Sequence, residues 1–298
     1  MSIRVTLAPL FRSAGDEGTL EAAFTIAKRF GSHVDALFAQ PDPTDTIPLF
    51  GEDTSPDTIR RLRETAIAAA EQQRLATRKA FDRACKTASI PLVNRPGVAA
   101  GQPSLAWTAG QPSAAWTDII GRSDVVVARK ALLSDLVVFG RNGVDAAPAV
   151  RPALEAVLLK SRRPILLVPT KTSEHIGHNV AIAWNGTAEA ASALASAMPF
   201  LEKAVTTHLL TVVTPRTVAD SADKAANYLA WHGIGSERHV INVDGEPVGA
   251  ALMREAVNTG ADLLVMGGYG HHRLRERILG GVTHDALNHA GLPILMAH

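Results

Sequence analysis

Two segments of the sequence repeat each other, and this repeat constrains the fold more than any other feature. Asp135–Gly140 reads DLVVFG and reappears as DLLVMG at Asp262–Gly267. A second pair follows, because RPILLV at Arg163–Val168 matches LPILMA at Leu292–Ala297. Such self-similarity indicates a tandem duplication of one folding unit. We place the boundary in the polar segment between the copies, which gives domains over residues 1–173 and 174–298.

The second copy alternates strand-like and helix-like segments. Short apolar runs predict strands and apolar residues at helical spacing predict helices. The strands are expected at 180–183, 209–213, 238–243, 263–266 and 294–296, and the helices around 190–201, 222–232 and 248–258. This alternation predicts right-handed crossovers and a parallel sheet covered on both faces. The first copy follows the same course from Ile3, so we predict an α/β fold of two tandem, doubly wound, five-stranded parallel sheets.

The last strands of the two copies are predicted to join the halves. Ile165–Val168 and Ile294–Met296 are apolar throughout, and apolar sheet edges left uncovered invite aggregation. We therefore expect these strands to dock against each other, so that the two halves form a pseudo-twofold pair.

The first copy contains two insertions. Ser55 followed by Pro56 is a helix start, and apolar positions from Ile59 towards Cys85 predict one side of a helix longer than seven turns. Its arginines fit a solvated face. The second insertion is a local duplication, GQPSLAW ending at Trp107 and GQPSAAW ending at Trp116, which we interpret as a surface loop.

Composition narrows the classes of function. Of 298 residues, 46% are apolar and 20% charged, which is typical of a folded domain. The formal net charge of +1 gives no field for nucleic acid or anionic lipid, and the apolar runs are too short to span a bilayer. The single cysteine, Cys85, excludes an internal disulfide and fits a reducing compartment. We therefore expect a cytoplasmic protein without an export signal.

A glycine-rich loop lies between the strand ending at Met266 and a predicted short helix. Gly267, Gly270 and Gly280 are separated by two and nine residues, and glycine lets the backbone approach a ligand closely. The free N–H groups and the dipole of the following helix favour an anion, and the dipole alone contributes about 0.3–1 kcal/mol. That helix opens with Gly281, Val282 and Thr283. We interpret the loop as a phosphate site, with a plain turn as the alternative.

This arrangement resembles the universal stress protein family, whose nucleotide binders carry Gly-two-Gly-nine-Gly after the fourth strand of a five-stranded parallel sheet. The resemblance covers the whole chain and implies a tandem member, a stress-response regulator that binds ATP or AMP, with or without Mg²⁺, in its second domain. The implied contacts to adenine and ribose are Ala183, Trp184, Asn185 and Val212. The implied phosphate contacts are Met266, Gly267, Gly270, Gly280, Gly281, Val282 and, as a compensating hydroxyl, Thr283.

The two copies differ from this pattern to different degrees. In the second, Asn185 stands where the nucleotide binders usually carry Asp, and Gly281 where they carry Ser or Thr. In the first, the second glycine pair is gone and Pro152 removes an N–H at the helix entrance, so we expect that half to be a poor phosphate site. Solvated or structural roles are favoured for its arginines at 141, 151, 162 and 163, with binding of another anion as the alternative.

Three classes of function stay open at this point. The first is the nucleotide-responsive regulator, and the second is a ligand-free scaffold of the same fold, which would need no cofactor. The third is an enzyme or small-ligand carrier, but no signature of a dedicated catalyst is present and slow ATP hydrolysis is the most that the loop suggests. Protein partners and a homodimer are also open. The histidines at 175, 178, 271, 272, 284, 289 and 298 lack metal-ligand spacing, so we expect no metal site among them.

Overall fold

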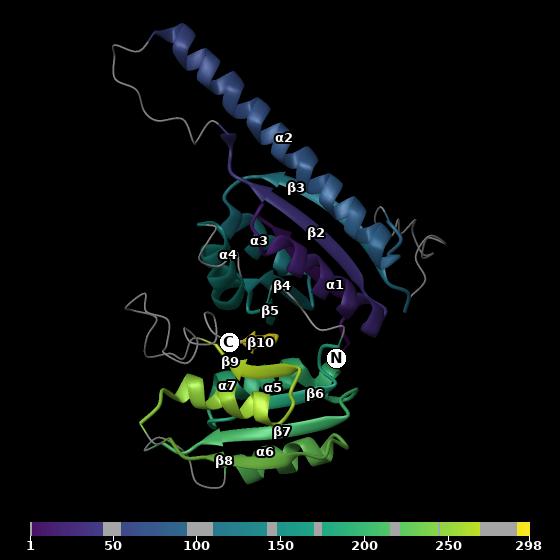
Figure 1. Cartoon of the computed structure of the whole chain (residues 1–298), viewed down its shortest axis with the longest axis vertical. Helices are drawn as coiled ribbons and strands as arrows, with labels where there is room; N and C mark the ends of the chain where they lie inside the picture. The colour runs from purple at the N-terminus through teal and green to yellow at the C-terminus, as the bar shows by residue number, and fades with distance from the viewer. Residues whose placement is uncertain are drawn as a thin grey trace.

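The computed structural model (Figure 1) shows one ten-stranded sheet that runs through the whole molecule. It describes residues 2–43, 55–93, 110–141, 148–169, 175–214, 221–243, 245–268 and 291–298. The strand order is β3-β2-β1-β4-β5-β10-β9-β6-β7-β8. The strands are β1 (Val5–Leu10), β2 (His33–Gln40), β3 (Ser113–Ile120), β4 (Leu136–Gly140), β5 (Ile165–Val168), β6 (Asn179–Ala183), β7 (Thr206–Val212), β8 (Glu237–Ile241), β9 (Leu263–Gly267) and β10 (Ile294–Ala297).

Helices cover both faces of this sheet. One face carries α1, α2, α5 and α6, and the other carries α3, α4 and α7, with a π-helical turn, η3, after α4. Each layer crosses from the first half into the second. The predicted doubly wound α/β fold is confirmed. The helices are α1 (Asp16–Phe30), α2 (Pro56–Ala88), α3 (Ser123–Ala131), α4 (Val150–Ala156), η3 (Val157–Ser161), α5 (Ala188–Leu201), α6 (Ser221–Trp231) and α7 (Val248–Asn258).

The aspartate that opens the repeated sequence has the same task in each half. Asp135 precedes β4, and its carboxylate accepts the backbone N–H groups of Arg4 and Val5 at the start of β1. Asp262 precedes β9, and its carboxylate accepts three N–H groups at the start of β6, those of Gly177, His178 and Asn179. Hydrogen bonds to a charged group contribute about 1.5–3 kcal/mol each. The aspartate therefore fixes the alignment of the two central strands of each half.

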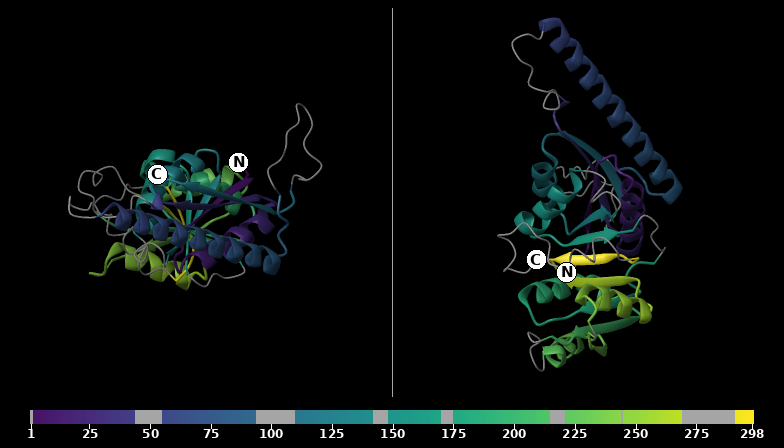
Figure 2. Two further views of the ribbon diagram at one scale, coloured as in Figure 1. Left: turned by 90° about the horizontal axis from the view of Figure 1, so that it is seen from above. Right: turned by 60° about the vertical axis from the view of Figure 1, so that its left-hand side comes forward.

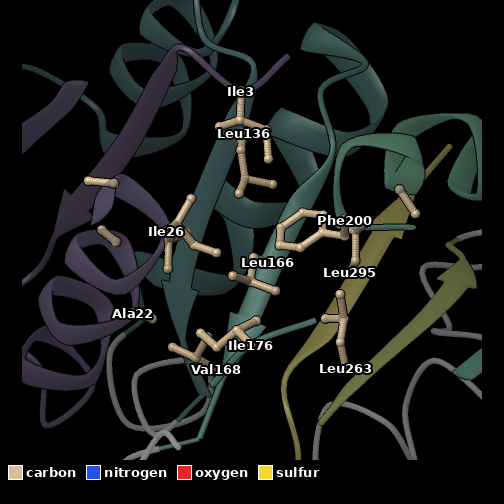
Figure 3. Close-up of a cluster of buried hydrophobic side chains, with 14 of the residues drawn as sticks. Ile3, Ala22, Ile26, Leu136, Leu166, Val168, Ile176, Phe200, Leu263 and Leu295 are labelled. Carbon is tan, nitrogen blue, oxygen red and sulfur yellow. The ribbon is translucent and has the colours of Figure 1, made fainter. Parts of the chain in front are cut away.

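The halves meet at β5 and β10, as the sequence predicts. These strands pair antiparallel, with Leu166 opposite Leu295, whereas every other strand pairing among the described residues is parallel. Figure 2 (right) shows β10, in yellow, between the two halves. In Figure 3, Leu166 and Leu295 lie beside Phe200 within one apolar cluster that continues into both halves.

The ends of α1 and α5 add a reciprocal contact across this junction. Arg29 Nη2 donates to the carbonyl oxygen of Lys203 at 3.0 Å, and Lys203 Nζ donates to the carbonyl oxygen of Arg29 at 2.9 Å. Phe30 and Phe200 pack edge to face with ring centroids 5.1 Å apart. Contacts that are exchanged in both directions are typical of a twofold interface. The predicted pseudo-twofold pairing therefore holds for helices as well as strands.

The long helix α2 packs over less of its length than its apolar positions predict. It begins at Pro56 after the Ser55 cap, as expected, and has 33 residues. Its buried residues, Thr77, Phe81 and Cys85, all lie towards its C-terminal end. Figure 1 shows the first part of α2 projecting beyond the sheet, so the expected packing side is exposed there. Its arginines include four that pair with carboxylates on the same helix, Arg60, Arg61, Arg74 and Arg78.

The local duplication of the first half is only in part a loop. The second copy contributes Ser113 and Trp116 to β3, which pairs with β2 at the outer edge of the sheet. Trp116 packs against Phe38 and Phe81, with ring centroids 6.0 and 5.5 Å away. The interpretation as a surface loop is therefore wrong for this copy, because the tryptophan gives it an apolar anchor. The first copy lies outside the described residues.

Within the described parts of the chain, no helix is both long and apolar enough to cross a membrane.

The junction predicts that the two halves unfold together. Leu295 is fully buried, and replacing a buried leucine by alanine costs about 2–5 kcal/mol. We expect Leu295→Ala to lower the free energy of unfolding by this amount while the protein still unfolds in one transition, followed in urea by circular dichroism and tryptophan fluorescence. Val205→Ala, at a side chain that is 78% exposed, should change it by less than about 0.5 kcal/mol. Two separate transitions, only one of them shifted, would contradict this view of the junction.

The environment of Cys85 predicts an unreactive thiol. The residue is 3% exposed, and burial, helped by the charge of Asp82, raises the pKa of the thiol to about 12. Because the thiolate is the reacting form, a thiol reagent should label the folded protein slowly and the urea-unfolded protein rapidly. Adding Ala69→Cys on the exposed part of α2 supplies a control thiol that should react rapidly in the folded state. Rapid labelling of the native Cys85 would show that the site opens.

Candidate functional site

The carboxyl ends of β6 and β9 form a topological switch point in the second half. β6 pairs with β7 on one side and with β9 on the other, and open α/β sheets bind ligands in the crevice outside the strand ends at such points. The structure brings six of the predicted residues to the carboxyl ends of β6, β9 and the neighbouring β7. Ala183 ends β6 and is followed by Trp184 and Asn185, Val212 ends β7, and Met266 and Gly267 end β9.

Trp184 is tied to the protein by its polar atom. The ring is half-buried and packs against the core on the side of α5 and α6. Its indole Nε1 donates to the carbonyl oxygen of Ser221, the first residue of α6, at 3.0 Å, and its backbone N–H donates to Leu210 at 2.8 Å. The ring therefore fixes α6 against the end of β6. A ligand at this point would meet the ring carbons or the backbone rather than the indole N–H.

Asn185 shapes the turn between β6 and α5. Its Oδ1 accepts the backbone N–H of Thr187 at 3.1 Å and the Thr187 hydroxyl at 2.9 Å. Thr187 in turn caps α5, because its Oγ1 accepts the N–H of Ala190 at 3.3 Å. The side chain of Asn185 is exposed at the strand end. It therefore stands where a ligand could reach it, while its oxygen already supports the helix cap.

The other three predicted contacts of the strand ends are apolar. Val212 and Met266 are 8% and 4% exposed and belong to the core that α7 covers, and Ala183 packs against the same core. They form an apolar floor below the switch point. Their burial leaves backbone atoms and side-chain edges for contact with a ligand.

Gly267 allows α5 to approach the end of β9. A β-carbon at this position would lie 2.8 Å from the backbone N of Ala190 and equally close to atoms of Glu189, a distance that real β-carbons do not reach. Gly140 does the same in the first half, where a β-carbon would lie 2.1 Å from the carbonyl oxygen of Gly15. The last glycine of the repeated motif is therefore required for packing between strand and helix, whatever its role towards a phosphate.

The remaining predicted residues, Gly270, Gly280, Gly281, Val282 and Thr283, lie outside the described residues. The described chain reaches Gly268, whose N–H donates to Ala297 at 2.8 Å. His298 Nδ1 lies 3.0 Å from the carbonyl oxygen of Gly268, and Ser192 Oγ donates to the carbonyl oxygen of His298 at 3.3 Å. These contacts hold the chain terminus against the entrance to the glycine loop.

In the first half, the loop after β1 is held by a carboxylate of the following helix. Asp16 accepts the backbone N–H groups of Phe11 and Arg12 at 3.1 and 2.8 Å, and the hydroxyl of Ser13 at 2.9 Å. Burial raises the pKa of Asp16, an effect that outweighs the lowering by these donors. Backbone N–H groups are what a phosphate would need, so this loop offers an anion little. Asp16 was not among the residues expected from the sequence, although an acidic residue directly after the β1 loop was a visible signal.

Three of the four arginines considered as anion ligands in the first half contact groups of the protein itself. Arg163 Nη2 donates to the carbonyl oxygen of Leu132 at 2.6 Å, and Arg151 lies 3.5 Å from the carboxylate of Glu155. Arg141 follows β4 and reaches across the junction to the carbonyl oxygen of Leu292 at 3.4 Å. Burial lowers the pKa of its guanidinium to about 10.

A groove of about 960 Å³ lies away from the second switch point. It runs between α1 and α2 in the first half and is lined by Leu20, Phe24 and Ala84, with Asp16 and Lys28 among its charged residues. It contains none of the residues predicted to bind a nucleotide.

The close approach at Gly267 predicts a stability effect that separates packing from ligand binding. Gly267→Ala would place a methyl group against the backbone of α5, and overpacking of this kind costs about 1–3 kcal/mol. Gly235→Ala is the matched control, because it lies in the same half with open space around it and should change stability by less than about 0.5 kcal/mol. Thermal unfolding without added ligand measures both, and equal stability of the two variants would remove the packing role.

Comparisons with known proteins agree with this architecture. Residues 197–298 match the model of the universal stress protein family. No curated protein sequence matches the chain. A universal stress protein from Archaeoglobus fulgidus DSM 4304 aligns over 98% of this chain and 97% of its own, with a TM-score of 0.67 and 15% identity. A putative universal stress protein from Pseudomonas aeruginosa UCBPP-PA14 aligns over 98% and 92%, with a TM-score of 0.52 and 15% identity.

A universal stress protein solved in complex with cAMP also aligns, over 57% of this chain and 100% of its own, with 16% identity and a TM-score of 0.33. A similarity this low carries no argument about a ligand of this chain. The two full-length alignments establish the fold, and the family match falls on the half that carries the glycine loop. Residues 197–298 therefore belong to a universal stress protein domain, and the chain as a whole has the tandem fold of universal stress proteins.

Proposed function

We propose that this chain is a stress-response regulator that binds one adenine nucleotide, ATP or AMP, at the switch point of its second half. The observation that carries the proposal is the difference between the two switch points. In the first half the carboxylate of Asp16 occupies the loop N–H groups. In the second half the corresponding turn carries the neutral, exposed Asn185 above an apolar floor. The loop N–H groups after β1 are therefore already bound by a carboxylate, whereas the turn after β6 is held by a neutral amide.

The glycine loop supports the same choice from the sequence. Only the second copy keeps Gly280 and Gly281 after Gly270, and the family match over residues 197–298 includes this loop. Adenine would rest on the apolar floor formed by Ala183, Val212 and Met266, and the phosphates, with Mg²⁺ in the case of ATP, would face the loop. We infer a cytoplasmic regulator with domains at 1–173 and 174–298 rather than a dedicated enzyme.

One observation favours a second function, that of a scaffold without nucleotide. The projecting part of α2 exposes Ile59, Leu62, Ile67 and Leu75, each 36–49% accessible. These side chains point to more than one side of the helix, and apolar side chains gathered on a segment outside the sheet are typical of surfaces that bind other proteins. Mass spectrometry of small molecules released from the purified protein distinguishes the two functions, because a scaffold would release no adenine nucleotide.

The sharpest test of the nucleotide site is Gly270→Val. A side chain at this position should add backbone strain of about 1–3 kcal/mol and block the approach of the phosphates. A loss of only about 1.4 kcal/mol lowers affinity tenfold, so we expect at least a tenfold increase in the Kd for ATP. Titration calorimetry on the unmodified chain should give one site per molecule.

The matched control is Gly143→Val in the loop of the first half, which should leave the affinity unchanged because that half is proposed to be empty. Circular dichroism of both variants establishes that each is folded. Equal losses in the two variants, two equivalent sites in the unmodified chain, or no loss in Gly270→Val would place the site elsewhere.

A further inference from the structure

The outer edge of the second half carries metal-ligating side chains that the proposed nucleotide site does not use. His208 lies on β7, and Glu237 and His239 lie on β8. We propose that these three side chains bind one divalent transition-metal ion of the zinc class, with the two imidazoles and the carboxylate as its protein ligands. This inference is independent of the proposed nucleotide binding.

Strand pairing places the three side chains on one face of the sheet. β7 and β8 are parallel, with His208 opposite Glu237 and Leu210 opposite His239. Paired residues of a parallel ladder, and residues two apart along a strand, point to the same face. Leu210 belongs to the core that α7 covers, so the three side chains lie on the α7 side of the sheet. Two strands, rather than a loop, therefore hold the ligand atoms.

The ligand atoms form a triangle of the size that a zinc ion requires. His208 Nδ1 lies 3.1 Å from His239 Nε2 and 3.4 Å from Glu237 Oε2, and the third side, from His239 Nε2 to Glu237 Oε2, is 3.9 Å. Tetrahedral zinc with bonds of about 2.0–2.2 Å separates its ligand atoms by about 3.3–3.6 Å. The side chain of Glu237 is 74% exposed, so its carboxylate is free to rotate and shorten the longest side.

Both imidazoles are set to present a lone pair to the cluster. His208 Nδ1 faces both of the other ligand atoms, and the neutral ring is the form that binds metals. His239 Nδ1 lies 3.4 Å from Oε1 of Glu255 on α7. A proton on that Nδ1 leaves Nε2 as the acceptor atom that faces His208. Carboxylates orient ligating histidines in this way at zinc sites generally.

The charges around the cluster favour a cation. Glu237 and Glu255 bring two carboxylates to the two imidazoles. Arg254 lies 3.8 Å from Glu255 and also binds Glu246 at 2.7 Å, so it offsets part of the charge of the second carboxylate. The carboxylate of Glu237 is then left to neutralise an ion between the rings.

The donor set selects the class of metal. Two nitrogens and one carboxylate suit Zn²⁺ and its transition-metal neighbours, whereas Mg²⁺ and Ca²⁺ prefer oxygen ligands alone. Three protein ligands leave the fourth position to water, as in open zinc sites. A bound ion would join β8, the outermost strand, to β7 and through Glu255 to α7.

A metal-free explanation of the same geometry makes a different prediction about Glu237. An N–H of one ring could donate to the nitrogen of the other at 3.1 Å, and that hydrogen bond needs only the two histidines. Metal binding also needs the carboxylate. Glu237→Gln, which keeps the shape of the side chain but weakens it as a ligand, therefore separates the two explanations.

The test is zinc titration of tag-free, chelator-treated protein, with Co²⁺ as an optical probe of four-coordinate geometry. We expect a Zn²⁺ site that His239→Ala weakens by at least about 100-fold and that Glu237→Gln and Glu255→Gln each weaken by about 10–100-fold. The intense visible bands of four-coordinate Co²⁺ should disappear in His239→Ala. His232→Ala, at an exposed histidine of the same half, is the matched control and should bind as the unmodified chain does.

Several results would overturn the proposal. His208 is buried, so His208→Ala could fail to fold, and the test therefore relies on the more exposed His239 and Glu237, with circular dichroism of each variant. If His239→Ala bound zinc as tightly as the unmodified chain, the zinc would be bound by other histidines and the proposed site would be wrong. Absence of Zn²⁺ and Co²⁺ binding in the unmodified chain would leave only the hydrogen bond between the rings. ATP titration of His239→Ala should match the unmodified chain, which distinguishes failure of this site from failure of the nucleotide site.

Discussion

The antiparallel pairing of β5 with β10 is the constraint on which the rest of the structure depends. Each half alone would leave an apolar strand edge open, and a parallel continuation would not relate the halves by a twofold axis. Antiparallel pairing closes both edges at once and creates the reciprocal contact between α1 and α5. It also leaves only β3 and β8 as outer strands of the described sheet. The switch points of the two halves are consequently separate, because β5 and β10 lie between them.

The sequence predicted the parts of the fold that depend on local pattern. The strands and helices follow from apolar runs and helical spacing, and the repeat itself led to the β5–β10 junction. The packing of α2 could not be predicted, because its apolar spacing continues where the sheet no longer lies beneath it. β3 was not predicted because the duplicated segment is rich in turn-forming residues. The aromatic partners that anchor Trp116, Phe38 and Phe81, are distant from it in sequence.

For the candidate site, the sequence predicted which residues lie at the strand ends. It did not predict which groups their side chains contact. Trp184 contacts α6, and Gly267 lies against α5. The spacing of residues along the chain does not predict such contacts between separate elements. Asp16 shows the same limit, since its carboxylate turns back to the loop before it. Two of these residues hold the scaffold of a switch point together, and Asp16 decides whether the loop has N–H groups to offer. The proposed difference between the two halves therefore depends on which side chain accepts the N–H groups of each loop.

The two outer strands show how the duplicated halves diverged. The first half covers β3 with the C-terminal part of the 33-residue α2, through Phe81 and Trp116. The second half has only the 11-residue α6 at the equivalent place, and its edge strand β8 carries Glu237, Arg238 and His239, with Ile241 as its buried apolar residue. Charged residues on an edge strand discourage pairing with another chain but provide little packing energy. Ligation of Glu237 and His239 together with His208 would supply, through one ion, the attachment that β3 obtains from an apolar helix face, and it would make the order of this edge depend on metal.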